Sequence, residues 1–287
     1  MPTPYDVITE NIIKRLEAGI VPWHRPWVGS QNAPTNLVSR KPYRGINPLI
    51  LASAGYASPF WLTFKQAQSL KGSVRKGEHG QKIVFWNVGE REKTDGSKER
   101  SFLLRYYTVF NALQCDGLTI PELETRTNNP ILTAENIALG YSGPTLDWTS
   151  SGAWYRPATD HISMPPKATF KSSEAIYATL FHEMGHSTGH ASRLNREGIA
   201  KHNGFGSELY SKEELIAEMT SAFLCADAGI DTEGILDNSA AYLASWIKVL
   251  KGDSKLIVSA AAGAQKAAGL ILGPGAEELD SDTEAAE

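Results

Sequence analysis

The chain has 287 residues and a net charge of −4, and 41% hydrophobic with 21% charged residues is typical of a soluble globular protein. No apolar run approaches the roughly 20 residues of a membrane-spanning helix, and the amphipathic N-terminus lacks the apolar core of a signal peptide. We therefore expect a cytoplasmic protein with no membrane partner, whose two cysteines, Cys115 and Cys225, are reduced and mostly buried.

The charge is divided unevenly along the chain. Residues 1–115 hold 16 Lys and Arg against 8 Asp and Glu, a balance of +8, together with 14 of the 26 aromatic residues. The rest of the chain holds 12 basic against 24 acidic side chains, a balance of −12. A basic, aromatic-rich part followed by an acidic part suggests two domains with different partners.

The first part is expected to form a small α+β domain. Apolar residues at helical spacing predict a helix over residues 5–18 that ends at Gly19, and the prolines and tryptophans of "VPWHRPW" (21–27) predict a turn. Propensity and patterning predict three further elements, with a charged hairpin loop ("GEREKTDGSKER") between the strands: a helix over 61–72 and strands over 82–88 and 100–112.

A polar stretch that ends in proline, "LETRTNNP" (123–130), is the predicted domain boundary. We assign residues 1–125 to the first domain, 126–272 to the second, and 273–287 to an acidic, disordered tail. The second domain is predicted to be mainly helical, with Ser172 or Ser173 and Ser211 as N-caps. It has two short strands within 153–166 and helices over 131–140, 172–189, 211–229, 238–252 and 254–272.

The helix predicted over 172–189 contains "HEMGH", an HExxH pattern. His182 and His186 are four residues apart, so both imidazoles project from one face of the helix and can bind one metal ion. Glu183 lies about 100° around the helix from His182, where it can reach a water molecule as a general base. The alternative is a charged helix that carries the pattern by chance.

A catalytic zinc uses three protein ligands and leaves a fourth position open, so a third ligand is expected downstream. Ser192 occupies the position of the third histidine in the metzincin pattern, which excludes that arrangement. His190 lies eight residues from His182, too far along the helix to complete a compact site.

The helix predicted over 211–229 offers a better source, because Glu214 and Glu218 share one of its faces. Glu214 can bind the metal while Glu218 hydrogen-bonds the free nitrogen of one histidine, and the reverse assignment is equally compatible with the spacing. The strand "HISMP" (161–165) precedes the HExxH helix, and we expect it to be the edge strand that pairs with an extended substrate.

Longer segments resemble a known family. "YATLFHEMGHSTGHASRLNR" and "FGSELYSKEELIAEMTSAFLCADAGI" resemble the C-terminal domain of ArdC/TraC-type antirestriction proteins, which conjugative plasmids carry. "VPWHRPW", "PTNLVSRKPYRGIN", "FWLTFKQAQSLKGSVRKGEHGQKIVFW" and "RYYTVFNALQ" resemble the N-terminal single-stranded DNA-binding domain of that family. The resemblance covers nearly the whole chain apart from the acidic tail.

This resemblance implies an α+β fold of two domains, a small α+β single-stranded DNA-binding domain followed by a zincin-like metallopeptidase domain. It also implies protection of incoming plasmid DNA from host restriction during conjugation. In related gluzincin-type sites the first Glu of ExxxE is the ligand, which favours Glu214 over Glu218. The expected cofactor is one divalent metal, zinc in the first place, with manganese or cobalt as alternatives for a His/His/Glu set.

The composition of the first domain agrees with binding to single strands. Such binding needs positive charge along the phosphates and flat side chains on which bases stack. For the basic residues the alternative is a solvated surface, and for most tryptophans it is core packing, which we prefer for Trp61 and Trp86. The predicted DNA-binding residues are Trp23, Arg25, Trp27, Arg40, Lys41, Tyr43, Arg44, Arg75, Lys76 and Lys82.

Together with the antirestriction role that the resemblance implies, these features predict a protein that binds single-stranded DNA and carries a metal-dependent peptidase-like site, with a DNA-bound protein as the candidate substrate. Glu183 takes the proton from a water that attacks a peptide carbonyl polarised by the metal. The alternative is a protein that protects DNA by coating it, with a structural or catalytically silent metal site. Hydrolysis of DNA is less favoured, because HExxH with a glutamate is peptidase geometry and nothing in the sequence suggests a second metal.

Overall fold

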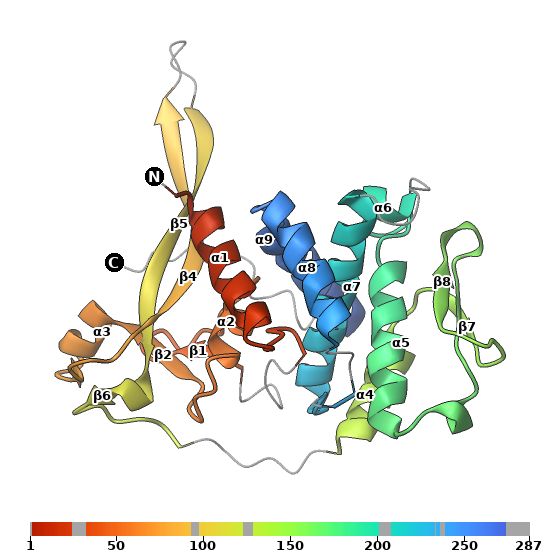
Figure 1. Cartoon of the computed structure of the whole chain (residues 1–287), viewed down its shortest axis with the longest axis horizontal. Helices are drawn as coiled ribbons and strands as arrows, with labels where there is room; N and C mark the ends of the chain where they lie inside the picture. Colours follow the sequence, from red (N-terminus) through yellow and green to blue (C-terminus); the bar gives the residue numbers. More distant parts are fainter. Residues whose placement is uncertain are drawn as a thin grey trace.

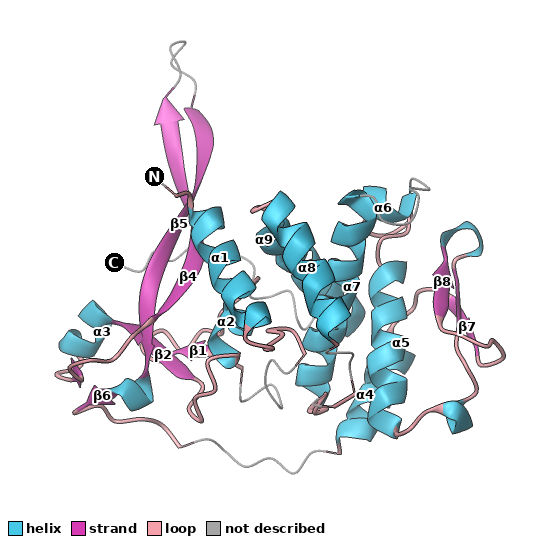
Figure 2. Cartoon of the chain, viewed as in Figure 1, coloured by secondary structure: helices cyan, strands magenta, loops and turns pink. Residues whose placement is uncertain are grey.

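The computed structural model describes residues 2–24, 33–92, 98–122, 129–200, 208–232, 234–235 and 239–273. It confirms the predicted two-part α+β architecture, in which a sheet-rich N-terminal part lies beside a mainly helical C-terminal part (Figures 1 and 2). The predicted boundary at residues 123–128, the acidic tail after Gly273, and Arg25 and Trp27 lie outside the described residues.

The N-terminal part is built on a four-stranded sheet with the order β1-β2-β5-β4. β1 is parallel to β2, and the other pairs are antiparallel. A small second sheet joins β3 to β6. The strands are β1 (Thr35–Asn36), β2 (Phe60–Thr63), β3 (Ser73–Val74), β4 (Gln81–Glu92), β5 (Lys98–Asn111) and β6 (Cys115–Asp116).

The β4–β5 hairpin is longer than the sequence predicted and projects well beyond the rest of the sheet (Figure 1). Most of the stretch expected to be a charged loop is paired strand. The register places Glu90 opposite Arg100 and Glu92 opposite Lys98.

Three helices complete the N-terminal part: α1 (Pro4–Glu17), α2 (Asn47–Ala52) and α3 (Phe64–Ser69). In α1 the Thr3 hydroxyl and the Asp6 carboxylate cap the first turn reciprocally, and Ile8, Ile12 and Leu16 form a buried stripe. The helix predicted over 61–72 was wrong in its first turn. Aromatic and β-branched residues there form β2, and Thr63 then caps the shorter α3.

The C-terminal part consists of packed helices and a small sheet with the order β7-β9-β8, which lies at one side of them against α5 (Figure 1). Its strands are β7 (Thr145–Asp147), β8 (Trp154–Arg156) and β9 (His161–Ser163), and its helices are α4 (Pro130–Gly140), α5 (Ser173–Ser187), α6 (Glu197–Ala200), α7 (Glu208–Ala228), α8 (Ala240–Gly252) and α9 (Leu256–Leu272). Short 3-10 turns occur at Ala112–Gln114, Pro157–Thr159 and Lys167–Thr169. Ser172 caps α5 as predicted, whereas Ser211 lies inside α7, which begins three residues earlier.

The predicted role of "HISMP" as an edge strand was wrong. β9 pairs with β7 on one side and with β8 on the other, so it is the central strand of its sheet. β7, which the sequence analysis missed, occupies one edge, and β8 occupies the other. Both β8 and the central strand β9 contact α5, so β8 is the edge strand that lies against this helix.

The two parts share one hydrophobic core. The buried stripe of α1 and the indole of Trp23 belong to the same cluster as buried residues of α5, α7, α8 and α9. Trp23 meets Trp246 of α8 edge-to-face, with ring centroids 6.2 Å apart. The N-terminal part therefore depends on the C-terminal helices to bury one face of α1.

α5 and α7 approach each other closely, which positions the site described below. A Cβ atom on Gly185 would lie 3.1 Å from Cα of Ala217 and 3.2 Å from Cβ of Thr220. Glycine at this position of α5 therefore lets the two helix backbones approach more closely than a larger residue allows.

In the part of the chain that the structure describes, no single helix is long and apolar enough to span a bilayer, although α8 and α9, bent by 107° at their break, together reach the required length and composition. Cys115 and Cys225 are free and buried, as predicted. Burial raises the pKa of the Cys225 thiol to about 12.

Candidate metal centre

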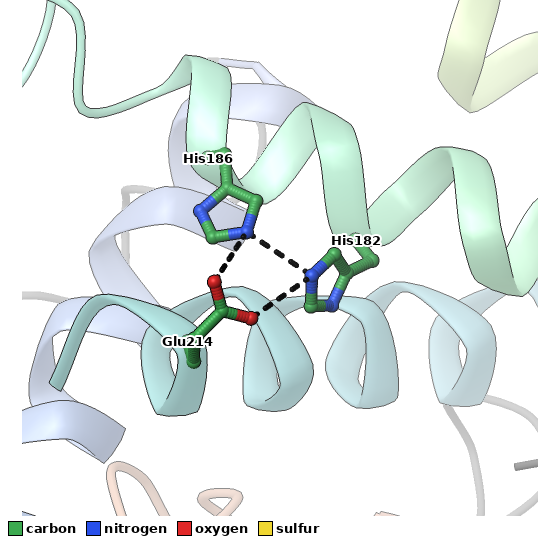
Figure 3. Close-up of side chains that lie close together, drawn as sticks. All are labelled: His182, His186 and Glu214. Atoms are coloured by element: carbon green, nitrogen blue, oxygen red, sulfur yellow. Dashed lines mark hydrogen bonds and ion pairs between the residues drawn. The ribbon is translucent and has the colours of Figure 1, made fainter. Parts of the chain in front are cut away.

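Three side chains from two helices form the candidate metal centre. His182 and His186 project from α5 and Glu214 from α7, and Figure 3 shows all three pointing toward one another. The Nε2 atoms of the two histidines lie 3.1 Å apart. Oε2 of Glu214 lies 3.6 Å from Nε2 of His182, and Oε1 lies 3.6 Å from Nε2 of His186.

These separations fit a single divalent ion. Zinc bonds to nitrogen and oxygen of about 2.0–2.1 Å at tetrahedral angles place ligand atoms about 3.3–3.4 Å apart. The observed spacings of 3.1 and 3.6 Å bracket that value. The side chains of His182 and Glu214 are 26% and 25% exposed, so the site opens toward solvent and a further ligand has access. Two imidazoles and one carboxylate with an open side are the donor set of a catalytic zinc site.

The charges of the three side chains are coupled. Burial alone would lower the pKa of His182, but the hydrogen bond with Glu214 and the surrounding carboxylates raise it overall. Burial alone would raise the pKa of Glu214, but the two histidines lower it overall. Glu214 is thus held as a carboxylate, which is the form that binds a metal.

His186 is oriented by a residue that the sequence analysis missed. Its Nδ1 lies 3.4 Å from Oε1 of Glu213, and a carboxylate only accepts, so Nδ1 donates and Nε2 is left to face the other ligands. Arg196 donates to both oxygens of Glu213, and it also donates to the Gly185 carbonyl. The Arg196 and His186 contacts outweigh burial and lower the pKa of Glu213. The sequence signal that could have identified Glu213 is its place beside Glu214 in "KEELIAE".

Glu218 does not make the hydrogen bond to a histidine that the sequence analysis predicted. Its Oε2 accepts a hydrogen bond of 2.6 Å from the indole N–H of Trp23 and another from the hydroxyl of Tyr242. Among the described residues, no hydrogen bond joins Glu218 to either histidine. Burial raises its pKa, which the two donors only partly offset. The expectation of a contact with His182 or His186 was wrong, because the tertiary structure supplies other donors.

Glu183 lies beside the three side chains, between α5 and the small sheet. Its side chain is buried, and the residue is only 7% exposed. Burial raises the pKa of its carboxyl group, while the charges of His186 and His182 and the backbone N–H of Tyr155 in β8 act in the opposite direction. A carboxylate with a raised pKa is suited to take a proton near neutral pH.

The structure removes two aromatic residues from the predicted DNA-binding set. Trp23 is 1% exposed and lies in the shared core. Tyr43 is 8% exposed and packs with Trp61, which is buried as expected. Neither ring presents a free face to a base, because burying these large rings within the fold stabilises it more than exposing them. The expectation for these two residues was wrong.

The described basic residues of the predicted set, which leave out Arg25, are at least partly exposed. Lys82 lies over the ring of Tyr106, with Nζ 5.3 Å from the ring centroid, and Arg40 lies 5.2 Å from the ring centroid of Phe60. Arg75 forms ion pairs with Glu78, at 2.8 Å, and with Asp116, and it donates a hydrogen bond to the carbonyl of Leu113. Those in exposed positions are Arg40, Arg75, Lys76 and Lys82, and those in half-buried positions are Lys41 and Arg44.

Exposed aromatic rings that the sequence analysis missed lie on the same part. Tyr106 of β5 is 45% exposed and Phe64 of α3 is 49% exposed. Tyr106 faces Lys82 across the hairpin, so a flat ring and a cation lie side by side.

Two family models match the chain. The N-terminal domain of anti-restriction factor ArdC matches residues 3–110, and a zincin-like metallopeptidase matches residues 134–263. Two crystal structures of the antirestriction ArdC protein from the R388 plasmid are 39% identical to the chain, and each comparison covers 93% of this chain and 96% of that one. The TM-score is 0.73 for the metal-free structure and 0.74 for the Mn(II)-bound structure.

Three curated relatives match nearly the whole of this chain but different shares of their own length. An uncharacterized protein, y4eC, of Sinorhizobium fredii is 38% identical over 92% of this chain and 90% of its own length. A DNA primase TraC of Escherichia coli is 38% identical over 97% of this chain but only 28% of its own length. A second TraC of that species is 40% identical over 93% of this chain and 20% of its own. The chain thus spans 28% and 20% of the length of these two primases.

Proposed function

This chain belongs to the ArdC family of antirestriction proteins, and we propose that it protects incoming plasmid DNA by binding it as a single strand and by metal-dependent cleavage of a DNA-bound protein. The observation that carries the proposal is the convergence of His182, His186 and Glu214 beside the buried Glu183. It occurs in a chain that resembles an ArdC protein over nearly its full length.

In this proposal His182, His186 and Glu214 hold one divalent metal. Zinc is our first assignment, and manganese is the main alternative because a similar ArdC structure contains Mn(II). When bound, the ion supplies positive charge that polarises a substrate carbonyl and acidifies water. Glu213 and Arg196 keep His186 in the tautomer that presents Nε2.

Glu183 acts as the general base. It follows His182 directly on α5, and its carboxylate accepts a hydrogen bond from the backbone N–H of Tyr155 in β8. β8 is the edge strand that contacts α5, so an extended polypeptide is the substrate class that this edge can align. Binding to DNA would raise the local concentration of protein targets on the same strand.

Single-stranded DNA is proposed to bind the N-terminal part, in the cytoplasm. The excess of positive charge there attracts phosphates, and exposed Lys82 lies over the exposed ring of Tyr106. The arrangement of Lys82 against Tyr106 supports stacking on the hairpin in place of the buried Trp23.

The proposal is tested by transferring an unmodified plasmid into a restricting recipient. A plasmid that encodes the wild-type chain should be established much more often than one that lacks it, whereas both should enter a recipient without restriction equally well. Glu183→Ala should bind metal and DNA normally yet lose the protection. If this variant protects fully, coating of the DNA accounts for antirestriction and the peptidase part of the proposal is wrong.

A further inference from the structure

The carboxylate of Glu218 lies close to the candidate metal centre without belonging to it. Glu218 follows Glu214 by four residues on α7, and residues at this spacing are neighbours on one helix face, with Cβ atoms about 5–6 Å apart. Glu218 therefore lies one helical turn from Glu214, a proposed ligand, on the same helix. A free carboxylate at this position would have the chemistry and the reach of a fourth protein ligand.

Two donors hold Glu218 in another direction, and both bind the same oxygen. The indole N–H of Trp23 lies 2.6 Å from Oε2, and the Tyr242 hydroxyl also donates to Oε2. Trp23 and Tyr242 lie 3.2 Å apart at their polar atoms, and both rings pack edge-to-face on Trp246. Because Trp23 is 1% exposed and locked in the shared core, its N–H has a fixed direction.

We propose that Trp23 and Tyr242 are positioning residues that keep Glu218 out of the metal ligand set. The centre then retains three protein ligands and one open position, which is the arrangement that a catalytic metal site requires. With Glu218 as a fourth ligand the site would be closed, as in structural sites. This inference rests on the proposed metal centre and adds to it a contribution from the N-terminal part, because Trp23 comes from the segment that follows α1.

The test uses the full-length chain loaded with Co(II), whose visible spectrum reports the number and geometry of its ligands. Acetohydroxamate, a small chelating anion, is then titrated as a probe of the open position. The wild-type spectrum should change with acetohydroxamate. In Trp23→Phe/Tyr242→Phe the spectrum before titration should already indicate an added ligand, and acetohydroxamate should bind at least about tenfold more weakly, in line with the size of effects that residues behind metal ligands produce.

A third variant distinguishes this effect from general disruption. Trp23→Phe/Tyr242→Phe/Glu218→Leu lacks the released carboxylate, so it should recover both the wild-type spectrum and the wild-type acetohydroxamate affinity. Should the double variant not fold, Tyr242→Phe alone keeps the ring that packs on Trp246 and removes only the hydroxyl donor to Glu218, and it should show the same change at smaller size.

The outcomes test the metal centre and the role of Trp23 and Tyr242 separately. If the wild-type chain binds no Co(II), the proposed metal centre itself is wrong. If it binds Co(II) but the Phe variants keep the wild-type spectrum and acetohydroxamate affinity, the metal centre stands and the role of Trp23 and Tyr242 is refuted. A loss that Glu218→Leu does not reverse also refutes it, because the released carboxylate would not be the cause.

Discussion

Glu213→Ala should weaken metal binding although Glu213 is not a proposed ligand. The side chain is 5% exposed and contacts the Nδ1 atom of His186, while Arg196, 13% exposed, donates to both of its oxygens. Without the carboxylate, His186 can rotate or change tautomer. Loss of such a partner typically weakens metal affinity by about 10–100-fold, which corresponds to about 1.4–2.7 kcal/mol.

The same substitution should lower the stability of the metal-free chain. Removing one partner of a buried ion pair costs about 3–5 kcal/mol when the other charge is left without compensation. Arg196 keeps the Gly185 carbonyl and the Thr188 hydroxyl as acceptors, so we expect a smaller loss of about 2–3 kcal/mol.

Chelator competition measures the metal affinity, and urea unfolding of the metal-free chain measures the stability. Glu17→Ala is a matched control, because Glu17 pairs with Lys251 at 3.4 Å with both side chains more than half exposed. It should change stability by less than about 1 kcal/mol and leave metal affinity unchanged. Unchanged metal affinity in Glu213→Ala would refute the orienting role of Glu213.

Three further predictions concern the helix contact, the DNA surface and acid stability. Gly185→Ala should push α5 away from α7, which should lower the free energy of unfolding by about 1–3 kcal/mol and weaken metal affinity in the same assays. Gly269→Ala is the control, because the space around Gly269 is open, and it should lower neither stability nor metal affinity. Tyr106→Ala should weaken binding of labelled single-stranded DNA by about 1–3 kcal/mol without changing the thermal midpoint, and an unchanged affinity would rule out stacking on the hairpin. The hydrogen bond from Arg193 lowers the folded-state pKa of Asp160, so its stabilising contribution is present above the unfolded pKa of about 3.9 and is lost as pH falls through the lower folded value. Urea unfolding should therefore show a smaller loss of stability on acidification in Asp160→Asn than in the wild-type chain, and identical pH profiles would contradict this.

The shared core determines how DNA binding must be measured. The buried stripe of α1 packs against α8 and α9, so a fragment of residues 1–125 would expose that face. Affinity and its salt dependence are therefore best compared between point variants of the full chain. Binding should weaken steeply as salt rises, because phosphate contacts release counterions.

Local patterns allowed much of the metal centre to be predicted. The spacing of His182 and His186 fixes their common face as soon as the segment is helical, and α5 formed with its predicted cap at Ser172. The spacing of Glu214 and Glu218 on α7 placed two carboxylates on one face but could not choose between them. The geometry that favours Glu214 depends on donors more than 20 residues away, which periodicity does not reveal.

The incorrect predictions share a physical reason, which is that tertiary contacts override local appearance. The tryptophan of "VPWHRPW" at position 23 looked available for stacking, yet its ring is buried in a core that both parts share. The strand "HISMP" looked like an edge because the partner strand β7 is short and lacks a strong alternating pattern. The charged stretch 89–100 looked like a loop, although residues 89–92 pair with residues 98–101 across the hairpin.

The metal content of purified full-length variants tests the central claim most directly. The wild-type chain and Glu218→Ala should each contain about one divalent metal ion per chain, in keeping with a single three-ligand site. His182→Ala and His186→Ala should contain none, and Glu214→Ala should retain little after dialysis against a weak chelator. Full metal content in Glu214→Ala together with loss in Glu218→Ala would contradict the ligand assignment, and a wild-type chain without bound metal would contradict the account as a whole.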